Sequence, residues 1–261
     1  MRKISHIVNA CVADKTSDLV VAQPVTFETM RIAKEFASDT VNVDLCAIKS
    51  RNEDLYIPIE FRILPDLQRS ILDIKNFTMQ KKLPLIRDIL DTLHENSNAD
   101  YFIYTNVDIA LQPGFYIYVN KLIDDGYDAF VINRRTITKE FSEIGDIPLM
   151  CAEVGDIHPG YDCFVFRRDV YPDYRLGNAC IGIGHIGQML IANLICNAKR
   201  FKLIKHAHVT FHIGDDRAGK IPEFQDMRDH NWSEVKNTLG YFKPGCDENT
   251  LQILDDAIHF R

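Results

Sequence analysis

The chain has 261 residues and a hydrophobic fraction of 46%, which is enough for one large α/β domain with a sizeable core. The formal net charge of −7 and the pI near 5.7 argue against nucleic acid or a membrane surface as the main partner. No apolar run reaches the roughly 18 residues that a membrane helix needs, and we expect the amino-terminal segment to be a strand, not a signal peptide.

The first half of the chain predicts alternating strands and helices. The expected elements are a strand over Ile4–Val12, a helix over Pro24–Ala37, a strand over Val41–Ile48 and a short strand over Phe61–Leu64. Around Pro84, apolar residues recur with helical spacing at Leu83, Ile86, Leu90 and Leu93. A proline is tolerated there because it would lie in the first turn of the helix. This helix leads into an apolar run that starts at Tyr101. The order is typical of a mostly parallel α/β sheet flanked by helices.

The second half predicts fewer regular elements. We expect strands over Ala129–Asn133 and Cys163–Phe166, a helix over Ile186–Ala198 and a last amphipathic helix over Leu251–Phe260. No repeat, linker or low-complexity segment separates these elements. The sequence therefore predicts a single domain over residues 1–261.

The cysteines indicate a reducing compartment. There are seven, an odd number, and no CxxC spacing occurs among them. Most lie among apolar residues, which is typical of free buried thiols. We therefore expect free cysteines and a cytoplasmic protein.

The segment from Tyr101 to Gly114 is the most informative part of the sequence. Its apolar run is typical of a strand buried on both faces, and Asn106-Val107-Asp108 follows directly. Residues after such a strand lie at the carboxyl edge of the sheet, where open α/β folds bind ligands. The oxygen ligands that Mg²⁺ and Mn²⁺ prefer are available there from Asp108, beside the Asn106 amide. The alternative is an aspartate that caps a turn before Pro113.

This pattern resembles the metal-binding DxD region of GT-A-fold glycosyltransferases, in which the motif ends a central strand and holds a metal on the diphosphate of a nucleotide sugar. Asp108 matches the second acid, whereas Asn106 replaces the first. The resemblance covers the chain from Ile4 to Arg217, and it rests on the order of the motifs.

The resemblance implies a GT-A-like, Rossmann-like nucleotide-binding half over about residues 1–110 and an elaborated acceptor half with a carboxyl-terminal extension over about residues 111–261. It implies an enzyme that transfers a sugar from a nucleotide-diphosphate sugar to a hydroxyl acceptor such as a glycan. It also implies a divalent cation, Mn²⁺ or Mg²⁺. The stereochemistry, the sugar, the base and the oligomeric state stay open.

Histidines and acids gather late in the chain, between Lys205 and Asp216. On a strand, His206, His208 and His212 would share one face, and neutral imidazoles there could complete a metal shell. The resemblance implies that a histidine of this segment is a further metal ligand, with His212 the better match before its glycine turn, then His208 and last His206. The alternative is a surface strand with solvated histidines.

A third motif surrounds Asp162, which precedes the predicted buried strand at Cys163 and follows Tyr161. The acid could hydrogen-bond a sugar hydroxyl while the aromatic ring offers a stacking face. In GT-A enzymes the corresponding stretch lines the donor sugar and the acceptor, which implies a catalytic role for Asp162. The alternative is an aspartate that caps a turn.

The glycine-rich segment Gly177–Gly187 fits neither a Walker loop nor a dinucleotide fingerprint, because it lacks the lysine and comes too late in the chain. Its position is that of the acidic motif that supplies the base in many inverting GT-A enzymes. His185 stands there instead. We consider it either a general base, since its unperturbed pKa is near neutral, or the cap of a helix.

Lys82 and Arg87 flank the start of the predicted helix after Pro84. They could contact a donor diphosphate, or they could belong to a solvated helix face.

Two other functions fit the same sequence. One is a metal-dependent phosphoester hydrolase built on the His/Asp cluster of residues 206–216, with His206, His208, His212 and Asp215. The other is a non-catalytic nucleotide-sugar-binding module, which the replacement by Asn106 permits.

Overall fold

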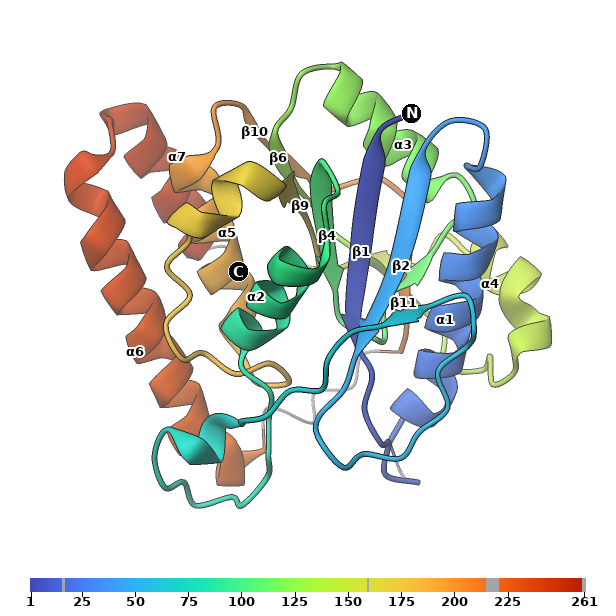
Figure 1. Cartoon of the computed structure of the whole chain (residues 1–261), viewed down its shortest axis with the longest axis horizontal. Coiled ribbons are helices and arrows are strands. Elements are labelled where there is room, and N and C mark those ends of the chain that lie inside the picture. Colours follow the sequence, from blue (N-terminus) through green and yellow to red (C-terminus); the bar gives the residue numbers. More distant parts are fainter. Residues whose placement is uncertain (16, 159, 215–220, 260–261) are drawn as a thin grey trace.

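A twisted central sheet runs through the molecule, with helices on both faces (Figure 1). The computed structural model describes residues 1–261 except 16, 159, 215–220 and 260–261. In that part the sheet has seven strands in the order β10–β6–β9–β4–β1–β2–β3. Their bounds are β1 (Lys3–Asn9), β2 (Asn42–Ile48), β3 (Arg62–Ile63), β4 (Tyr101–Thr105), β6 (Ala129–Ile132), β9 (Cys163–Arg167) and β10 (Phe201–Ile204).

Strand β9 is the exception in a parallel arrangement. It runs antiparallel to both of its neighbours, β4 and β6, while the other paired strands of this sheet are parallel. The mostly parallel α/β sheet predicted from the sequence is confirmed. Because β9 is reversed, its first residue lies at the edge where β4 and β6 end.

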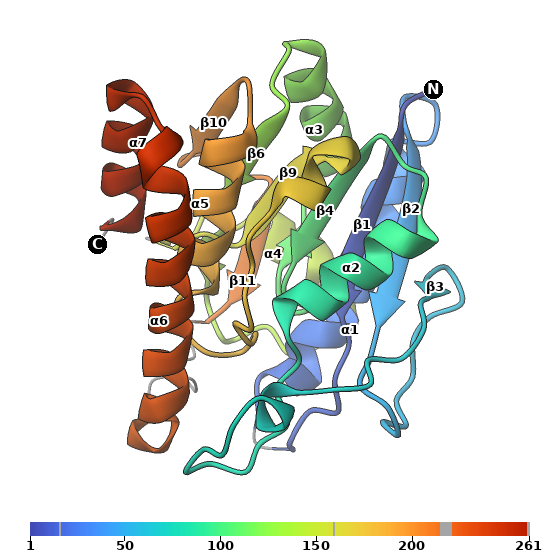
Figure 2. The ribbon, with the colours of Figure 1, turned by 60° about the vertical axis from the view of Figure 1, so that its left-hand side comes forward.

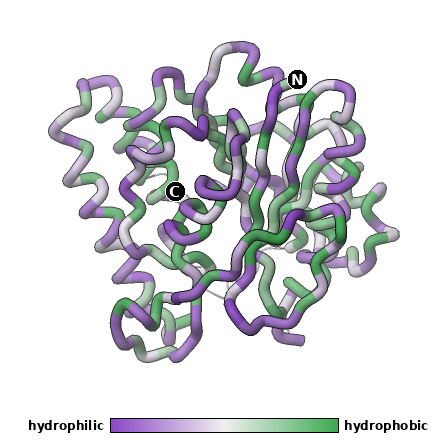
Figure 3. The backbone as a smooth tube through the Cα atoms, in the orientation of Figure 1, coloured by the Kyte–Doolittle hydropathy of each residue, from purple (hydrophilic) through white to green (hydrophobic). Residues whose placement is uncertain are grey.

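The two faces of the sheet are covered by different helices, as Figure 2 shows. Side chains alternate between faces along a strand. In β1, Ile7 belongs to the buried cluster on one face, whereas Ile4 and Val8 belong to the cluster on the other face. Figure 3 shows the result, with hydrophobic residues concentrated along the central strands and hydrophilic ones common in the peripheral loops.

The helices are α1 (Leu19–Phe36), α2 (Ile86–Asn96), α3 (Phe115–Asp124), α4 (Ile147–Ala152), α5 (Ile186–Asn197), α6 (Gln225–Phe242) and α7 (Glu248–Ile258). Short 3₁₀ turns lie at Ile71–Asp73, Ile144–Asp146, Arg168–Asp173, Pro222–Phe224 and Lys243–Gly245. Within the described ranges, no helix has the length and apolar character needed to cross a bilayer.

The amino-terminal elements differ from the prediction at two boundaries. Strand β1 ends at Asn9, before Val12, and α1 begins at Leu19, before Pro24. The first turn of α1 is already formed upstream of the proline, because Val21 and Ala22 donate backbone N–H groups to the carbonyl of Asp18. The proline therefore lies inside the helix, where it removes one early hydrogen bond.

A smaller sheet lies beside the carboxyl edge of the central one. It has four strands in the order β5 (Ala110–Leu111), β11 (Thr210–Ile213), β7 (Arg135–Ile137) and β8 (Asp156–Ile157). Strand β11 pairs with β5, which follows β4 after a short turn. In this pairing Phe211 lies opposite Ala110, so two segments that are far apart in the sequence meet beside the carboxyl edge of the central sheet.

Asn231, in α6, fixes the glycine-rich segment that leads into α5. Its fully buried amide oxygen accepts the backbone N–H of Cys180 at 3.0 Å. Its amide nitrogen donates to the carbonyls of Cys180 and Gly184 at 2.9 and 3.0 Å. One side chain thus satisfies three backbone groups that have no partner in a regular element.

We predict that Asn231→Ala destabilises the protein by about 2–4 kcal/mol, because backbone groups are left buried without partners. Asn237→Ala is the matched control, since Asn237 lies exposed on the same helix and its loss should change stability by less than about 0.5 kcal/mol. Urea unfolding followed by circular dichroism measures both. Equal stability of the two variants would contradict the role given to Asn231.

Candidate functional site

Three chain segments meet at the carboxyl edge of the central sheet. Thr105, the last residue of β4, and Ile132, the last residue of β6, both lie opposite Cys163, the first residue of β9. Asp108 and Arg134 follow β4 and β6, and Asp162 immediately precedes β9. The register of the strands therefore places two carboxyl groups and a guanidinium at one edge, which is where open α/β sheets bind ligands.

Asp108 is paired with His212 of β11. The His212 Nε2 atom lies 3.2 Å from the Asp108 Oδ2 atom. On the other side of the ring, the Nδ1 atom lies 2.7 Å from the carbonyl oxygen of Gly214, so Nδ1 donates and Nε2 faces the carboxylate. The His212 side chain is 5% exposed and that of Asp108 is 25% exposed. Asp108 and His212 are thus in direct contact, while their predicted role as metal ligands stays a prediction.

The pKa values of the pair shift in opposite directions. Burial alone would raise the pKa of Asp108, but the hydrogen bond and charge of His212, together with the charge of Arg134, lower it. Burial alone would lower the pKa of His212, but the hydrogen bond and charge of Asp108 raise it against the opposing charge of Arg134. Without a ligand, the pair favours an imidazolium next to a carboxylate.

The Asp108 carboxylate keeps one unused oxygen. Its Oδ1 atom is buried and has no hydrogen-bond partner among the described residues. Nearby in sequence, the exposed Asn106 uses its amide oxygen to accept from the Tyr104 hydroxyl at 2.9 Å. Among the described residues, no group of three or more His, Cys, Asp or Glu side chains could hold a metal ion. The cluster at this edge is the pair of Asp108 and His212.

Asp162 lies against Arg134 in a second buried pair. The Arg134 Nη1 atom is 3.5 Å from the Asp162 Oδ1 atom, and the two side chains are 8% and 9% exposed. Arg134 also approaches His158, with 3.5 Å between Nη2 and Nδ1. The Asp162 Oδ2 atom is buried without a partner in the described part of the chain. The acid was predicted to precede a buried strand, and it does.

Arg134 was missed by the sequence analysis. The signal was present, because Arg134 follows the apolar strand β6 as Asp108 follows β4. A basic residue after a strand does not by itself indicate a functional site. Only the position of β6 next to β9 shows that its end belongs to the same edge.

His185 occupies the N-cap position of α5 in the left-handed conformation, with φ of 81°. Its side chain makes no capping hydrogen bond, and its buried Nδ1 atom has no partner among the described residues. Burial lowers its pKa, and its ring lies 5.0 Å from that of Trp232. Gly187, in the first turn of α5, is packed so closely on Tyr161 that an added Cβ would lie 3.2 Å from it. The helix start that carries His185 is therefore adjacent to the Asp162 segment.

The other predicted histidines lie outside β11. The strand spans Thr210–Ile213, so only His212 is within it, and the prediction that all three histidines share one strand face is wrong. His208 precedes the strand and contacts the Gln112 amide, with 3.1 Å between its Nε2 atom and the amide nitrogen. His206 is exposed in a turn. Asp215 and Asp216 lie outside the described residues.

The predicted cations lie on the flank of the site. Lys82 is exposed, and its charge acts on Asp73, while Arg87 is half-buried on α2 and its charge acts on Tyr171. The neighbouring Lys81 was not singled out from the sequence. Its charge and that of Asp108 both act on the Cys11 thiol after β1, whose pKa burial raises to about 11. The Lys81 Nζ atom itself lies 5.9 Å from the centre of the Phe224 ring.

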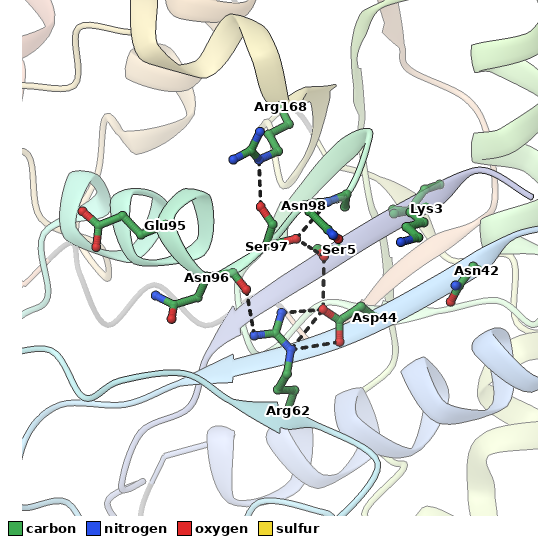
Figure 4. A pocket seen from close by; sticks show the side chains of 12 residues that line it. Lys3, Ser5, Asn42, Asp44, Arg62, Glu95, Asn96, Ser97, Asn98 and Arg168 are labelled. Atoms are coloured by element: carbon green, nitrogen blue, oxygen red, sulfur yellow. Dashed lines mark hydrogen bonds and ion pairs between the residues drawn. The ribbon is translucent and has the colours of Figure 1, made fainter.

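A cavity of about 660 Å³ lies at the opposite edge of the sheet, where Lys3 and Asn42 begin β1 and β2. Figure 4 shows that its polar side chains reach one another, with Arg62 bonded to Asp44. In the wall of the cavity, the Ser5 hydroxyl lies 2.8 Å from the Ser97 hydroxyl. None of the site residues named above lines this cavity, so we place the candidate site at the carboxyl edge.

No protein-family model and no curated protein sequence matches this chain. Several solved structures, however, match its fold. Residues 1–349 of S. aureus TarS in complex with UDP superpose with a TM-score of 0.58 at 10% identity, over 98% of this chain and 69% of that one. Glucosyl-3-phosphoglycerate synthase from Mycobacterium tuberculosis, in complex with Mn²⁺, UDP and glucosyl-3-phosphoglycerate, gives 0.52 at 15% identity, over 92% and 80% of the two chains.

These similarities agree with the topology described above. Both solved proteins are GT-A glycosyltransferases, and both match almost the whole described sheet and its helices. The chain therefore has the GT-A fold, as the sequence resemblance predicted.

The charges of the Asp108–His212 pair predict a pH-dependent stability. The pKa of His212 is raised in the folded state, so its contribution is complete below about pH 6.5, the unfolded value, and is lost as pH rises through the folded pKa. We expect the unfolding free energy of the wild type, relative to His212→Asn, to fall as the pH rises above about 6.5 and through the raised pKa of His212. Urea unfolding in the presence of a chelator measures it.

His206→Asn is the control for this measurement, because it replaces an exposed histidine of the preceding turn. Its profile should follow that of the wild type. If the difference between wild type and His212→Asn is independent of pH, the ion pair is not formed in solution.

Proposed function

We propose that the protein is a glycosyltransferase that moves a sugar from a nucleotide-diphosphate sugar to a hydroxyl acceptor with the help of a divalent cation. The observation that carries the proposal is the Asp108–His212 pair, which lies at the carboxyl edge of a GT-A sheet beside the buried Asp162. The bound ligands of the two solved structures support it, since both hold UDP and one also holds Mn²⁺.

The residues present suit a divalent cation. Asp108 offers a buried Oδ1 atom that has no partner among the described residues, and His212 offers the Nε2 atom that faces the same carboxylate. Oxygen and imidazole donors suit Mn²⁺ and Mg²⁺. When bound, such a cation neutralises the charge that develops on the leaving diphosphate. Asn106 adds a neutral amide in place of a second acid, so the donor's own phosphate oxygens are needed to complete the shell.

Three basic residues between β3 and the first turn of α2 would bind the diphosphate of the donor. Lys81 is one candidate, because its charge acts on the same Cys11 thiol as the charge of Asp108. Lys82 and Arg87 stay candidates on the same flank. A point charge of this kind attracts phosphate oxygens without requiring a fixed geometry.

Asp162 and His185 would act on the sugar and the acceptor. The Asp162 Oδ2 atom, which has no partner among the described residues, can accept a hydrogen bond from a hydroxyl, while Arg134 holds the other oxygen in place. Burial lowers the pKa of His185, so its imidazole is mostly neutral at pH 7, and its Nδ1 atom has no partner in the same part of the chain. We assign the reacting group to Asp162 and a positioning role at the helix start to His185.

The two alternative functions are less well supported. A hydrolase built on the late histidines requires His206 and His208 to join His212 on one face, and only His212 lies in β11. A non-catalytic binding module would bind a donor without turnover. The cytoplasmic location stays a prediction from the cysteine pattern.

We predict that a nucleotide-diphosphate sugar binds in a Mn²⁺-dependent manner and that Asp108→Ala and His212→Ala each abolish this dependence. The reason is that each variant removes one of two protein ligands. Titration calorimetry against a panel of donors measures binding with and without Mn²⁺. His206→Ala is the matched control and should bind like the wild type. Unchanged Mn²⁺-dependent affinity in folded Asp108→Ala would show that the metal assignment is wrong.

Once the donor is identified, a turnover assay with it tests the role assigned to Asp162. Contacts made mainly in the transition state lower kcat more than they change donor binding. We predict that Asp162→Asn keeps donor affinity and loses turnover by about 10²-fold or more. His185→Ala should lose less. If Asp162→Asn turns over normally while His185→Ala is inactive, the two roles are reversed. Binding by the wild type without any turnover would favour the binding module.

A further inference from the structure

Two cysteines from distant parts of the chain lie in contact at the end of α5. The Sγ atoms of Cys196 and Cys246 are 3.8 Å apart, and both side chains are partly buried. All seven cysteines are free thiols, and this is the one sulfur–sulfur contact among the described residues. A disulfide needs about 2.05 Å between the sulfurs, so the two sulfurs would have to approach by about 1.8 Å to form the bond.

The two thiols belong to different elements that are far apart along the chain. Cys196 lies in the last turn of α5, and Cys246 follows the 3₁₀ turn Lys243–Gly245 between α6 and α7. The Cys246 thiol also donates to the carbonyl of Phe242 at 3.4 Å, which holds it near the end of α6. Helix α7 packs on α5 through Leu254, in the same apolar cluster that Cys196 borders.

We propose that Cys196 and Cys246 are an oxidative cross-linking site, which a low-molecular-weight disulfide converts into a bond between α5 and the α6–α7 connection. In this exchange the Cys246 sulfur attacks the small disulfide and releases one thiol. Cys196 then attacks the Cys246 sulfur of the mixed disulfide and releases the second thiol. The protein pair loses two electrons and two protons, and the small disulfide gains both as two thiols.

The surroundings of the two sulfurs favour this order. Burial, together with the neighbouring Cys246, raises the pKa of the Cys196 thiol to about 12, so Cys196 is a poor first nucleophile. Cys246 lies in a connection whose preceding residues, 243–245, are exposed to solvent. It is therefore the thiol that a small oxidant reaches first.

The cross-link would act on the segment that carries Asp162. The hydroxyl of Tyr161 donates to the carbonyl of Ala257 in α7 at 2.8 Å. Tyr161 also packs against Gly187 at the start of α5. Fixing α7 on α5 would thus hold both partners of Tyr161, which directly precedes Asp162. The cross-link itself does not depend on the proposed function.

The test is exposure of the folded protein to oxidised glutathione, followed by alkylation and peptide mapping without reduction. We expect the loss of two of the seven free thiols and a cross-linked pair of peptides that contain Cys196 and Cys246. The midpoint of thermal unfolding should rise by about 5 °C or more, since the link closes a long loop in the unfolded chain.

Two variants make the test specific. Cys246→Ser should lose no thiol pair and show no rise in the midpoint. Cys151→Ser is the matched control, because Cys151 is another partly buried free thiol, and it should cross-link like the wild type. The proposal is overturned if glutathione stays attached to either cysteine without closure. It is equally overturned if the thiols are lost only after unfolding in urea.

Discussion

The reversed strand β9 is the constraint on which the candidate site depends. In a wholly parallel sheet, the residue before a strand lies at the edge opposite the residues that follow its neighbours. Because β9 runs antiparallel between β4 and β6, Asp162 reaches the same edge as Asp108 and Arg134. The smaller sheet then adds His212, since β11 pairs with the strand that follows Asp108. The site is thus a product of topology more than of any one motif.

The electrostatics of this edge are consistent with a ligand site. The half-buried Asp108 and the buried Asp162 face one imidazole and one guanidinium, so their charges are largely compensated. Each acid nevertheless keeps one buried oxygen without a partner in the described part of the chain. An unsatisfied buried oxygen costs stability, and such groups in native proteins call for an explanation. Under the proposed function, both oxygens would contact the substrate, a cation or both.

The sequence predicted the parts of this site that rest on local patterns. An uninterrupted apolar run identified β4 and therefore placed Asp108, and the same reasoning placed Asp162 before β9. It could not predict partners that depend on register between distant strands, which is why Arg134 was missed. Period-two spacing suggested one strand for all three histidines, but pairing with β5 and β7 confines the strand to Thr210–Ile213. The buried bonds of Asn231 left no trace in its helix pattern, because they depend on tertiary contact.

The most direct measurement of the central claim is a crystal structure of the protein with UDP and Mn²⁺, with anomalous diffraction data collected for manganese. The account predicts an anomalous peak within about 2.0–2.3 Å of an Asp108 carboxylate oxygen and of His212 Nε2, and in contact with the diphosphate. A nucleotide bound at this edge with the manganese held elsewhere, or a nucleotide bound at the opposite edge of the sheet, would contradict it.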